Sequence, residues 1–258
     1  MDRFAPRPAA TIVVIRNESE LLEILMLRRH DGSRFAPGAH VFPGGVVDQS
    51  DYDVVRRGLV AGRDENVARR VLHLGEGALA YYCAAVRELF EESGVLVTTD
   101  DVLDVASLGP RVLEGWREEL EHGAVGWADL LAREGLRLAV RDVEYWAHWV
   151  TPRGRSRRFD TRFFVVRAPE EHGARPDGRE VVDAVWVSAT EALVRHRRGE
   201  WALLHPTIRT LEELEGFRRV DDVLAHATRR EVVRIEPQEI IRDGKVVIVG
   251  PDDPGYVA

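Results

Sequence analysis

Hydrophobic and polar positions follow both strand-like and helix-like periods along the chain. Residues 11–16 and 22–29 are rich in β-branched residues and leucine, flank a polar turn and predict a β-hairpin. A glycine-rich loop at 38–45 carries a short strand through residues 40–42. Further strands are predicted at 95–97, 144–150, 158–167 and 180–187, and helices at 76–93, 111–122, 127–134, 189–198, 206–217 and 221–230, before an extended tail. Interleaved strands and helices predict a three-layer α/β fold.

Three carboxylates gather on one side of the predicted helix 76–93, which Gly94 ends. With about 100° per residue, Glu88, Glu91 and Glu92 share an arc of about 100°. The opposite side is apolar, as a core-facing stripe should be. Like charges at this spacing repel, and the dipole at a helix C-terminus disfavours anions. A divalent cation such as Mg²⁺, which prefers carboxylate oxygens, would offset both costs.

A glycine pair upstream strengthens the prediction of a metal site. Gly44 and Gly45 end the segment Phe-Pro-Gly-Gly, and glycine lets the backbone approach a ligand closely. Taken without this loop, the acidic helix would be read as a solvated face with one arginine pair. The combination of loop and helix instead favours a site for a metal ion and a pyrophosphate.

Composition narrows the class of protein. The chain has 258 residues, 45% hydrophobic and 31% charged, as expected of a globular protein. Cys83 is the single cysteine, which excludes an intrachain disulfide and suits a reducing compartment. Residues 1–10 lack a signal-peptide core, and no apolar run reaches the roughly 18 residues of a membrane span. We therefore expect a cytoplasmic protein that does not bind membranes. The net charge of −8 disfavours nucleic-acid binding.

The residues 87–95, Arg-Glu-Leu-Phe-Glu-Glu-Ser-Gly-Val, resemble the second half of the signature of the Nudix hydrolase family without exception. Gly45 resembles its opening glycine. The family separates these parts by thirteen residues, whereas 41 lie between Gly45 and Arg87, an insertion of 28 that we place within 46–74. The early glutamate of the signature falls on Leu79, with Glu76 out of register. The resemblance implies an α/β/α sandwich with a mixed sheet, spanning 8–200, and a C-terminal helical extension and tail at 201–258 packed on it.

A second resemblance is to the acyl-coenzyme A diphosphatase subfamily. It rests on residues 36–48, 149–152, 158–161 and 206–207, and covers roughly residues 8–225. The motif of coenzyme A-cleaving Nudix enzymes is matched at Leu25, Arg29, Arg34, Gly38 and 42–45, but Leu27 and His30 replace its threonine and small residue. The last four residues, 255–258, are not a peroxisomal address, as expected of a bacterial relative.

The resemblance implies which residues carry the chemistry. Glu88 and Glu92 would bind Mg²⁺ or Mn²⁺, Glu91 would join them or take a proton from water, and the Gly44 carbonyl would add a ligand. Arg87 would orient the glutamates. Arg29 and Arg34 would hold substrate phosphates, with Gly44 and Gly45 also at the substrate. A further carboxylate could come from Glu144, Asp160 or Glu180. His40 is expected to be a structural, hydrogen-bonded histidine rather than a base, and Trp146 and Trp149 to pack in the core.

Three functions remain open from the sequence. The first is hydrolysis of coenzyme A or acyl-coenzyme A to adenosine 3′,5′-bisphosphate and (acyl-)phosphopantetheine. The second is hydrolysis of another nucleoside diphosphate derivative, such as ADP-ribose, NADH or a dinucleotide. The third is a non-catalytic module that senses a nucleotide, which the three retained glutamates disfavour. The insertion would form a lid or a wall for the acyl arm, with a homodimer contact as an equal alternative.

Overall fold

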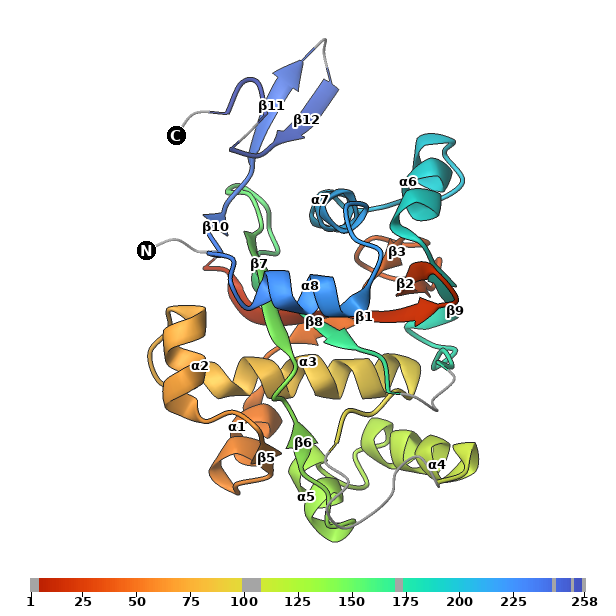
Figure 1. The fold of residues 1–258 in the computed structure, drawn as a ribbon, viewed down its shortest axis with the longest axis vertical. Helices are drawn as coiled ribbons and strands as arrows, with labels where there is room; N and C mark the ends of the chain where they lie inside the picture. The colour runs from red at the N-terminus through yellow and green to blue at the C-terminus, as the bar shows by residue number, and fades with distance from the viewer. Residues whose placement is uncertain (1–4, 99–107, 170–173, 243–244, 252, 257–258) are drawn as a thin grey trace.

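A mixed sheet forms the middle layer of the fold (Figure 1). The computed structural model describes residues 5–98, 108–169, 174–242, 245–251 and 253–256. The sheet has the order β10-β7-β8-β1-β2-β3, with β4 also paired to β1 and β9 to β2. Its strands are β1 (Arg7–Glu18), β2 (Leu21–Arg29), β3 (His40–Val41), β4 (Gly44–Val46), β7 (Glu144–Val150), β8 (Phe159–Arg167), β9 (Val181–Val187) and β10 (Arg234–Ile235). β1 and β8 run parallel, whereas β1–β2 and β7–β8 are antiparallel.

Alternation within the central strands builds two separate cores. In β1, Ile12 and Val14 are buried in one core and Val13 and Ile15 in the other. Successive side chains of a strand point to opposite faces, so a strand covered on both sides reads as a continuous apolar run. The predicted hairpin is confirmed, with longer strands than the pattern indicated.

Helices cover both faces of the sheet (Figure 1), which confirms the three-layer arrangement. One face carries α1 (Gln49–Arg56), α2 (Glu65–Leu72), α3 (Ala78–Ser93), α4 (Pro110–Glu121) and α5 (Trp127–Arg133). The other carries α6 (Ala189–Arg197), α7 (His205–Leu214) and α8 (Val220–Ala227). α3, which is buried along most of its length, packs against β1 and forms the larger core with the central strands.

The insertion is part of this core. Residues 46–74 contain α1, the short strand β5 (Val60–Ala61) and α2, and both helices pack against α3. β5 pairs with β6 (Leu138–Ala139) outside the main sheet. Val54, Ala68 and Leu72 are buried, so the insertion supports the acidic helix from the side.

Three sequence-based expectations were wrong. The helix begins at Ala78 rather than 76, because Gly77 adopts φ 86° and Glu65 accepts hydrogen bonds from the first backbone N–H groups of α3. Residues 95–97 are not a strand; only Thr98 forms an isolated bridge, to Leu138. The tail is not simply extended, because β11 (Gln238–Arg242) and β12 (Lys245–Val249) form an antiparallel hairpin.

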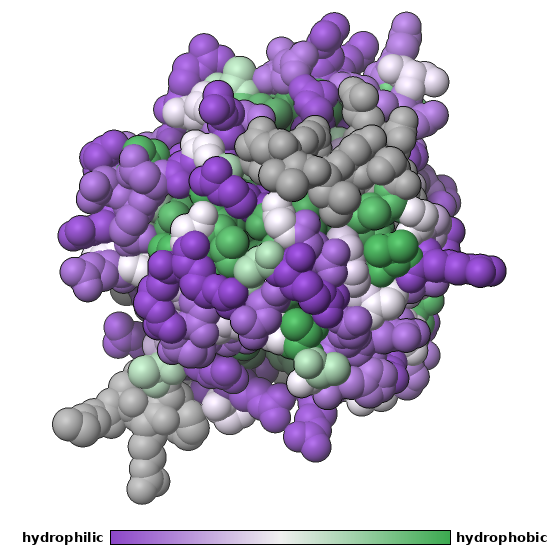
Figure 2. Space-filling model, turned by 90° about the horizontal axis from the view of Figure 1, so that it is seen from below, coloured by the Kyte–Doolittle hydropathy of each residue, from purple (hydrophilic) through white to green (hydrophobic). Residues whose placement is uncertain are grey.

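The surface over the helices at the bottom of Figure 1 is mainly hydrophilic. Figure 2 views this face and shows hydrophobic side chains between more numerous hydrophilic ones. Within the described ranges, no helix combines the length and the apolar character that crossing a membrane requires.

Candidate functional site

The C-terminal end of α3 lies in contact with Gly44 and Gly45, the first residues of β4, which we call the glycine turn. The Gly44 N–H donates a hydrogen bond of 3.1 Å to Oε2 of Glu92. A Cβ added at Gly45 would lie 2.3 Å from Oε1 of Glu88, so the carboxylate rests directly on the glycine backbone. Pairing of β4 with β1, through Ala10 opposite Gly45, holds the turn at this place. Only glycine leaves room for this approach.

Glu88, Glu91 and Glu92 form an acidic cluster at the end of α3, and Arg87, which is buried, contacts two of them. Its Nη1 donates to Oε1 of Glu88 at 2.9 Å and to Oε2 of Glu91 at 2.8 Å. Its Nη2 donates to the Val46 carbonyl at 2.9 Å, which ties the helix to β4, the strand that also contains Gly44 and Gly45. The contact between Arg87 and Glu91 is the one expected from their i,i+4 spacing.

Asp51 is a partner of Arg87 that the sequence analysis missed. Its two carboxylate oxygens accept from Nε and Nη2 of Arg87 at 2.9 and 3.1 Å, and the side chain is fully buried. Asp51 lies in α1, where it also completes a capping box with Asp48. That local pattern, an aspartate cap followed three residues later by an acid, was visible in the sequence. Its distant partner was not.

A second arginine closes the acidic end of α3. Nε and Nη2 of Arg117, in α4, donate to the Glu91 carbonyl at 3.0 and 2.8 Å. Gly94 ends the helix with φ 73° and donates its N–H to the Phe90 carbonyl. A cation beside the last carbonyls of a helix stabilises it, so Arg117 offsets part of the cost of placing glutamates there.

Electrostatics at the cluster favour a cation. Burial raises the pKa of Glu88 to about 7, and burial also raises the pKa values of Glu91 and Glu92. Burial disfavours the charge of Arg87 as well, but the hydrogen bond with Asp51 and the charges of the neighbouring acids raise its pKa above the ordinary value. Buried or half-buried carboxylates of this kind keep their charge when a metal ion compensates it.

The donor set fits a hard divalent ion, which takes carboxylate and carbonyl oxygens. Across the described residues, however, no three acidic, histidine or cysteine side chains converge as a ready-made metal cage. The reason is visible in the contacts, because Arg87 holds Glu88 and Glu91 while the Gly44 N–H holds Glu92. A metal ion would have to replace part of these interactions.

An arginine-rich cavity of about 360 Å³ lies between the end of β2 and the segments that precede β8 and β9. Both predicted phosphate-binding residues, Arg29 and Arg34, line it. Two further arginines, Arg157 and Arg179, were not singled out from the sequence and come from other segments of the chain. The full lining is Arg29, His30, Gly32, Ser33, Arg34, Phe35, Arg157, Arg179 and Glu180.

The three candidate downstream carboxylates occupy different places. Glu144 lies 3.3 Å from Nη2 of Arg63. Asp160 lies 2.6 Å from both His148 and Arg162. Glu180 alone among the three lines the cavity, and its charge contributes to raising the pKa of Glu92, after burial and the charge of Glu88.

The aromatic residues are structural. Trp146 and Trp149 are buried in the core, as expected. His40 stacks on Trp201 with ring centroids 3.8 Å apart, and burial lowers its pKa to about 4. Its Nδ1 has no hydrogen-bond partner in the described part of the chain, so this ring nitrogen does not provide the hydrogen bond that was expected for His40, and the ring is held by stacking.

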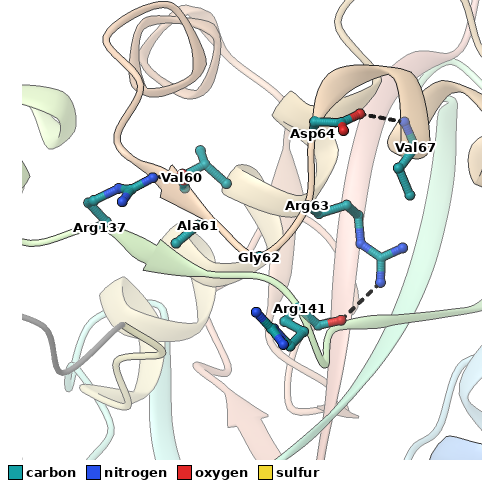
Figure 3. A pocket seen from close by; sticks show the side chains of 8 residues that line it. All are labelled: Val60, Ala61, Gly62, Arg63, Asp64, Val67, Arg137 and Arg141. Atoms are coloured by element: carbon teal, nitrogen blue, oxygen red, sulfur yellow. Dashed lines mark hydrogen bonds between the residues drawn. The ribbon is translucent and has the colours of Figure 1, made fainter.

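A larger cavity of about 610 Å³ lies elsewhere, between the insertion and β6. Figure 3 shows Arg63, Arg137 and Arg141 around it. Arg63 donates to the Arg141 carbonyl at 3.1 Å and stands over the ring of Tyr82, in the N-terminal half of α3. This cavity is therefore separate from the glutamates at the other end of that helix.

Comparisons with known proteins identify the family to which the chain is similar. The family model of the NUDT19 Nudix domain matches residues 73–214. Human acyl-coenzyme A diphosphatase NUDT19 is 30% identical over 242 residues, which cover 80% of this chain and 64% of that protein. The Xenopus laevis protein of the same name is 27% identical over 241 residues, covering 81% and 63%. The chain thus spans just under two thirds of the length of these two relatives.

A solved structure shares the fold. The NUDIX hydrolase from Alicyclobacillus acidocaldarius has a TM-score of 0.72 and 28% sequence identity, over 86% of this chain and 97% of that one. The domain match covers more than half of the chain and contains the acidic helix. By this match and by the structural likeness, the chain belongs to the Nudix hydrolase family.

Proposed function

We propose that the protein hydrolyses the diphosphate bond of coenzyme A or acyl-coenzyme A, releasing adenosine 3′,5′-bisphosphate and (acyl-)phosphopantetheine. The observation that carries the proposal is the contact of the Gly44–Gly45 turn with Glu88 and Glu92, beside a cavity lined by arginines. The relatives named acyl-coenzyme A diphosphatase support this substrate among the diphosphates that such a site could cleave.

The glutamates would hold the metal ion, Mg²⁺ or Mn²⁺. Glu88 and Glu92 are the proposed ligands, with the Gly44 carbonyl as a further one. Glu91 would either join them or accept a proton from the attacking water at its carboxylate. When bound, such an ion lowers the pKa of water and neutralises charge that develops on the phosphate oxygens.

Arg87 acts as a positioning residue in this proposal. It holds Glu88 and Glu91 from one guanidinium nitrogen while Asp51 holds the other side of the fork. Arg87 thus fixes the side chains of Glu88 and Glu91 at the end of α3, and a bound metal ion would replace part of these hydrogen bonds. Phosphoryl transfer depends chiefly on positioning and electrostatics. Glu180 is the downstream carboxylate that we assign to the same site, because it lines the cavity near Glu92.

Arg29 and Arg34 would bind the substrate phosphates. Nε of Arg29 donates to the Phe35 carbonyl at 3.1 Å, which orients its fork beside the cavity. A guanidinium presents donors in a plane that matches two phosphate oxygens. The insertion serves as a support for α3 in this view, since α1 supplies Asp51 and α2 supplies Glu65.

A substrate panel with Mg²⁺ or Mn²⁺ tests the proposal. Coenzyme A, an acyl-coenzyme A, ADP-ribose, NADH and a dinucleotide are compared by chromatography of the products. We expect Glu92→Gln to lower kcat at least about 100-fold, because a metal ligand supplies several kcal/mol in the transition state. Glu76→Gln is the matched control: Glu76 is exposed just before α3 and should change activity less than twofold, in line with roughly neutral surface substitutions.

Each outcome has a meaning. If ADP-ribose is cleaved ten times faster than coenzyme A, the substrate assignment is wrong and the alternative diphosphate class is favoured. If no substrate is turned over with either metal, while nucleotides bind, the protein is a nucleotide-sensing module. If Glu92→Gln retains full activity, the role assigned to the acidic helix is wrong.

A further inference from the structure

We propose that Arg157, acting with Arg34, binds a phosphate monoester on the nucleoside half of the substrate and so distinguishes 3′-phosphorylated nucleotides from unphosphorylated ones. The inference rests on the proposed function, because it takes the acidic end of α3 as the place where the diphosphate is cut. It assigns a specificity-determining role to a residue of the loop between β7 and β8.

The cavity concentrates positive charge in an acidic protein. Four arginines and one glutamate line it, whereas the whole chain has a net charge of −8. The arginines come from three segments: the end of β2 with the loop that follows it, the loop before β8 and the loop before β9. Cations brought together from separate segments repel one another unless an anion lies between them. A ligand with several negative charges is the natural counterpart of such a cavity.

Two of these arginines have no partner among the residues that the structure describes. Arg179 forms an ion pair with Glu121, and Arg29 donates to a backbone carbonyl. Over the ranges that the structure describes, neither Arg34 nor Arg157 forms a hydrogen bond or an ion pair, and both are exposed. Their guanidinium groups can therefore bind a ligand without first giving up a protein contact.

The neighbours of Arg157 in the same loop behave differently. Arg153 lies 3.4 Å from Oε1 of Glu236, and Arg155 is paired with Glu239. Both contacts join the loop to the C-terminal segment, and neither arginine lines the cavity. Arg157 is thus set apart from other exposed arginines of its loop by its position and by its free donors.

An aromatic ring stands beside the two free arginines. Phe35 is 45% exposed, which is high for a large apolar side chain, and its ring packs edge-on against Phe159, with centroids 6.0 Å apart. Phe35 follows Arg34 directly, and Phe159 lies two residues after Arg157. An exposed aromatic face next to phosphate-binding arginines suits a stacked nucleobase. The cavity volume of about 360 Å³ falls in the range of small-molecule sites.

The cavity also lies close enough to the acidic helix for one substrate to reach both. Arg29 and Glu180 line the cavity, and the segment that leads to Glu180 is hydrogen-bonded to the end of α3, since the Arg175 N–H donates to the Ser93 carbonyl at 2.8 Å. A substrate with its diphosphate at Glu92 therefore has its nucleoside half beside Arg34 and Arg157. The ligand chemistry that uses all of these groups is a purine nucleotide with a diphosphate and a separate phosphate monoester.

The test compares coenzyme A with 3′-dephospho-coenzyme A, which differ only in the monoester. For Arg157→Ala we expect kcat/KM on coenzyme A to fall about tenfold, the value of one charge-assisted hydrogen-bonded contact at a partly exposed site. The rate on 3′-dephospho-coenzyme A should stay within twofold. Arg157→Lys should recover part of the loss, because lysine keeps the charge without the fork. Arg153→Ala is the matched control and should leave both rates unchanged, and thermal denaturation checks the fold of each variant.

Binding is measured in parallel, so that the two proposals can fail separately. Calorimetry of wild type and Arg157→Ala compares adenosine 3′,5′-bisphosphate with AMP. If Arg157→Ala weakens the binding of the bisphosphate but not that of AMP, the inference is supported, whether or not coenzyme A is cleaved. A failure to cleave coenzyme A would overturn the proposed function instead. Equal effects of Arg157→Ala on both substrates or both nucleotides would overturn the inference. So would a wild-type enzyme that treats the phosphorylated and dephosphorylated forms alike.

Discussion

Replacing Asp51 by asparagine removes one charge from a buried ion pair and leaves the shape of the side chain almost unchanged. Asp51 is fully buried and holds Arg87 through two hydrogen bonds. Removing one partner of a buried pair costs about 3–5 kcal/mol, since the other charge is left uncompensated. Here Arg87 retains Glu88 and Glu91, and asparagine can still accept a hydrogen bond. We therefore expect a loss of about 2 kcal/mol, below that range.

Urea denaturation followed by circular dichroism measures this loss as a lower midpoint with an unchanged slope. In thermal denaturation it corresponds to a decrease in Tm of about 4–8 °C for a domain of this size. Asp53→Asn is the matched control, because Asp53 lies on the same helix and pairs with Arg56 at the surface. An exposed pair contributes about 0–1 kcal/mol. If the two variants lose the same stability, the buried pair does not anchor the acidic helix to α1.

Two further perturbations probe the glycine turn and the stacked histidine. Gly45→Ala would place a Cβ 2.3 Å from Oε1 of Glu88 and should lower kcat about 100-fold, the effect of displacing a catalytic group by about 1 Å. Gly115→Ala is the control, because a Cβ at Gly115 meets no atom within 4 Å. Equal kcat values for the two variants would refute the close contact between Gly45 and Glu88. Burial lowers the pKa of His40 in the folded chain to about 4, below the ordinary histidine pKa of about 6.5. Between these pH values the unfolded chain binds a proton that the folded chain does not, so stability falls as the pH decreases through this window. His40→Phe keeps the stack on Trp201 and removes the titrating group. In urea denaturation, the free energy of unfolding of this variant should therefore fall by about 2 kcal/mol less than that of the wild type between pH 7 and pH 5. An unchanged pH profile would show that the folded chain does not protect the His40 ring from protonation.

Several features of the site depend on contacts between segments that are far apart in the chain. Asp51 meets Arg87 across the insertion, Glu65 receives the first N–H groups of α3, and Arg157 shares a cavity with Arg34. Periodicity reports which face of an element is buried, but not which distant side chain lies opposite. These partners could therefore not be deduced from residue spacing.

The errors in secondary structure have a similar origin. Val95, Leu96 and Val97 have strand-like side chains, yet a strand requires a neighbour with free N–H and C=O groups, and only Thr98 bridges to Leu138. The tail lacks strong periodicity, but its two halves pair with each other from Gln238 to Val249. In both cases backbone pairing, which belongs to the tertiary structure, decided the outcome.

The amino-acid sequence by itself determined the elements whose information is local. The placement of Arg87, Glu88, Glu91 and Glu92 on a helix ended by Gly94, and the alternation of the hairpin strands, follow from spacings within one segment. Only the folded chain decided that Arg87 is held from both sides, that the glycine turn touches two of the glutamates, and which arginines remain free around the cavity. The physical reason is range: helical and strand periods arise between near neighbours, whereas burial, ion pairing and cavity shape arise only when distant segments are packed together.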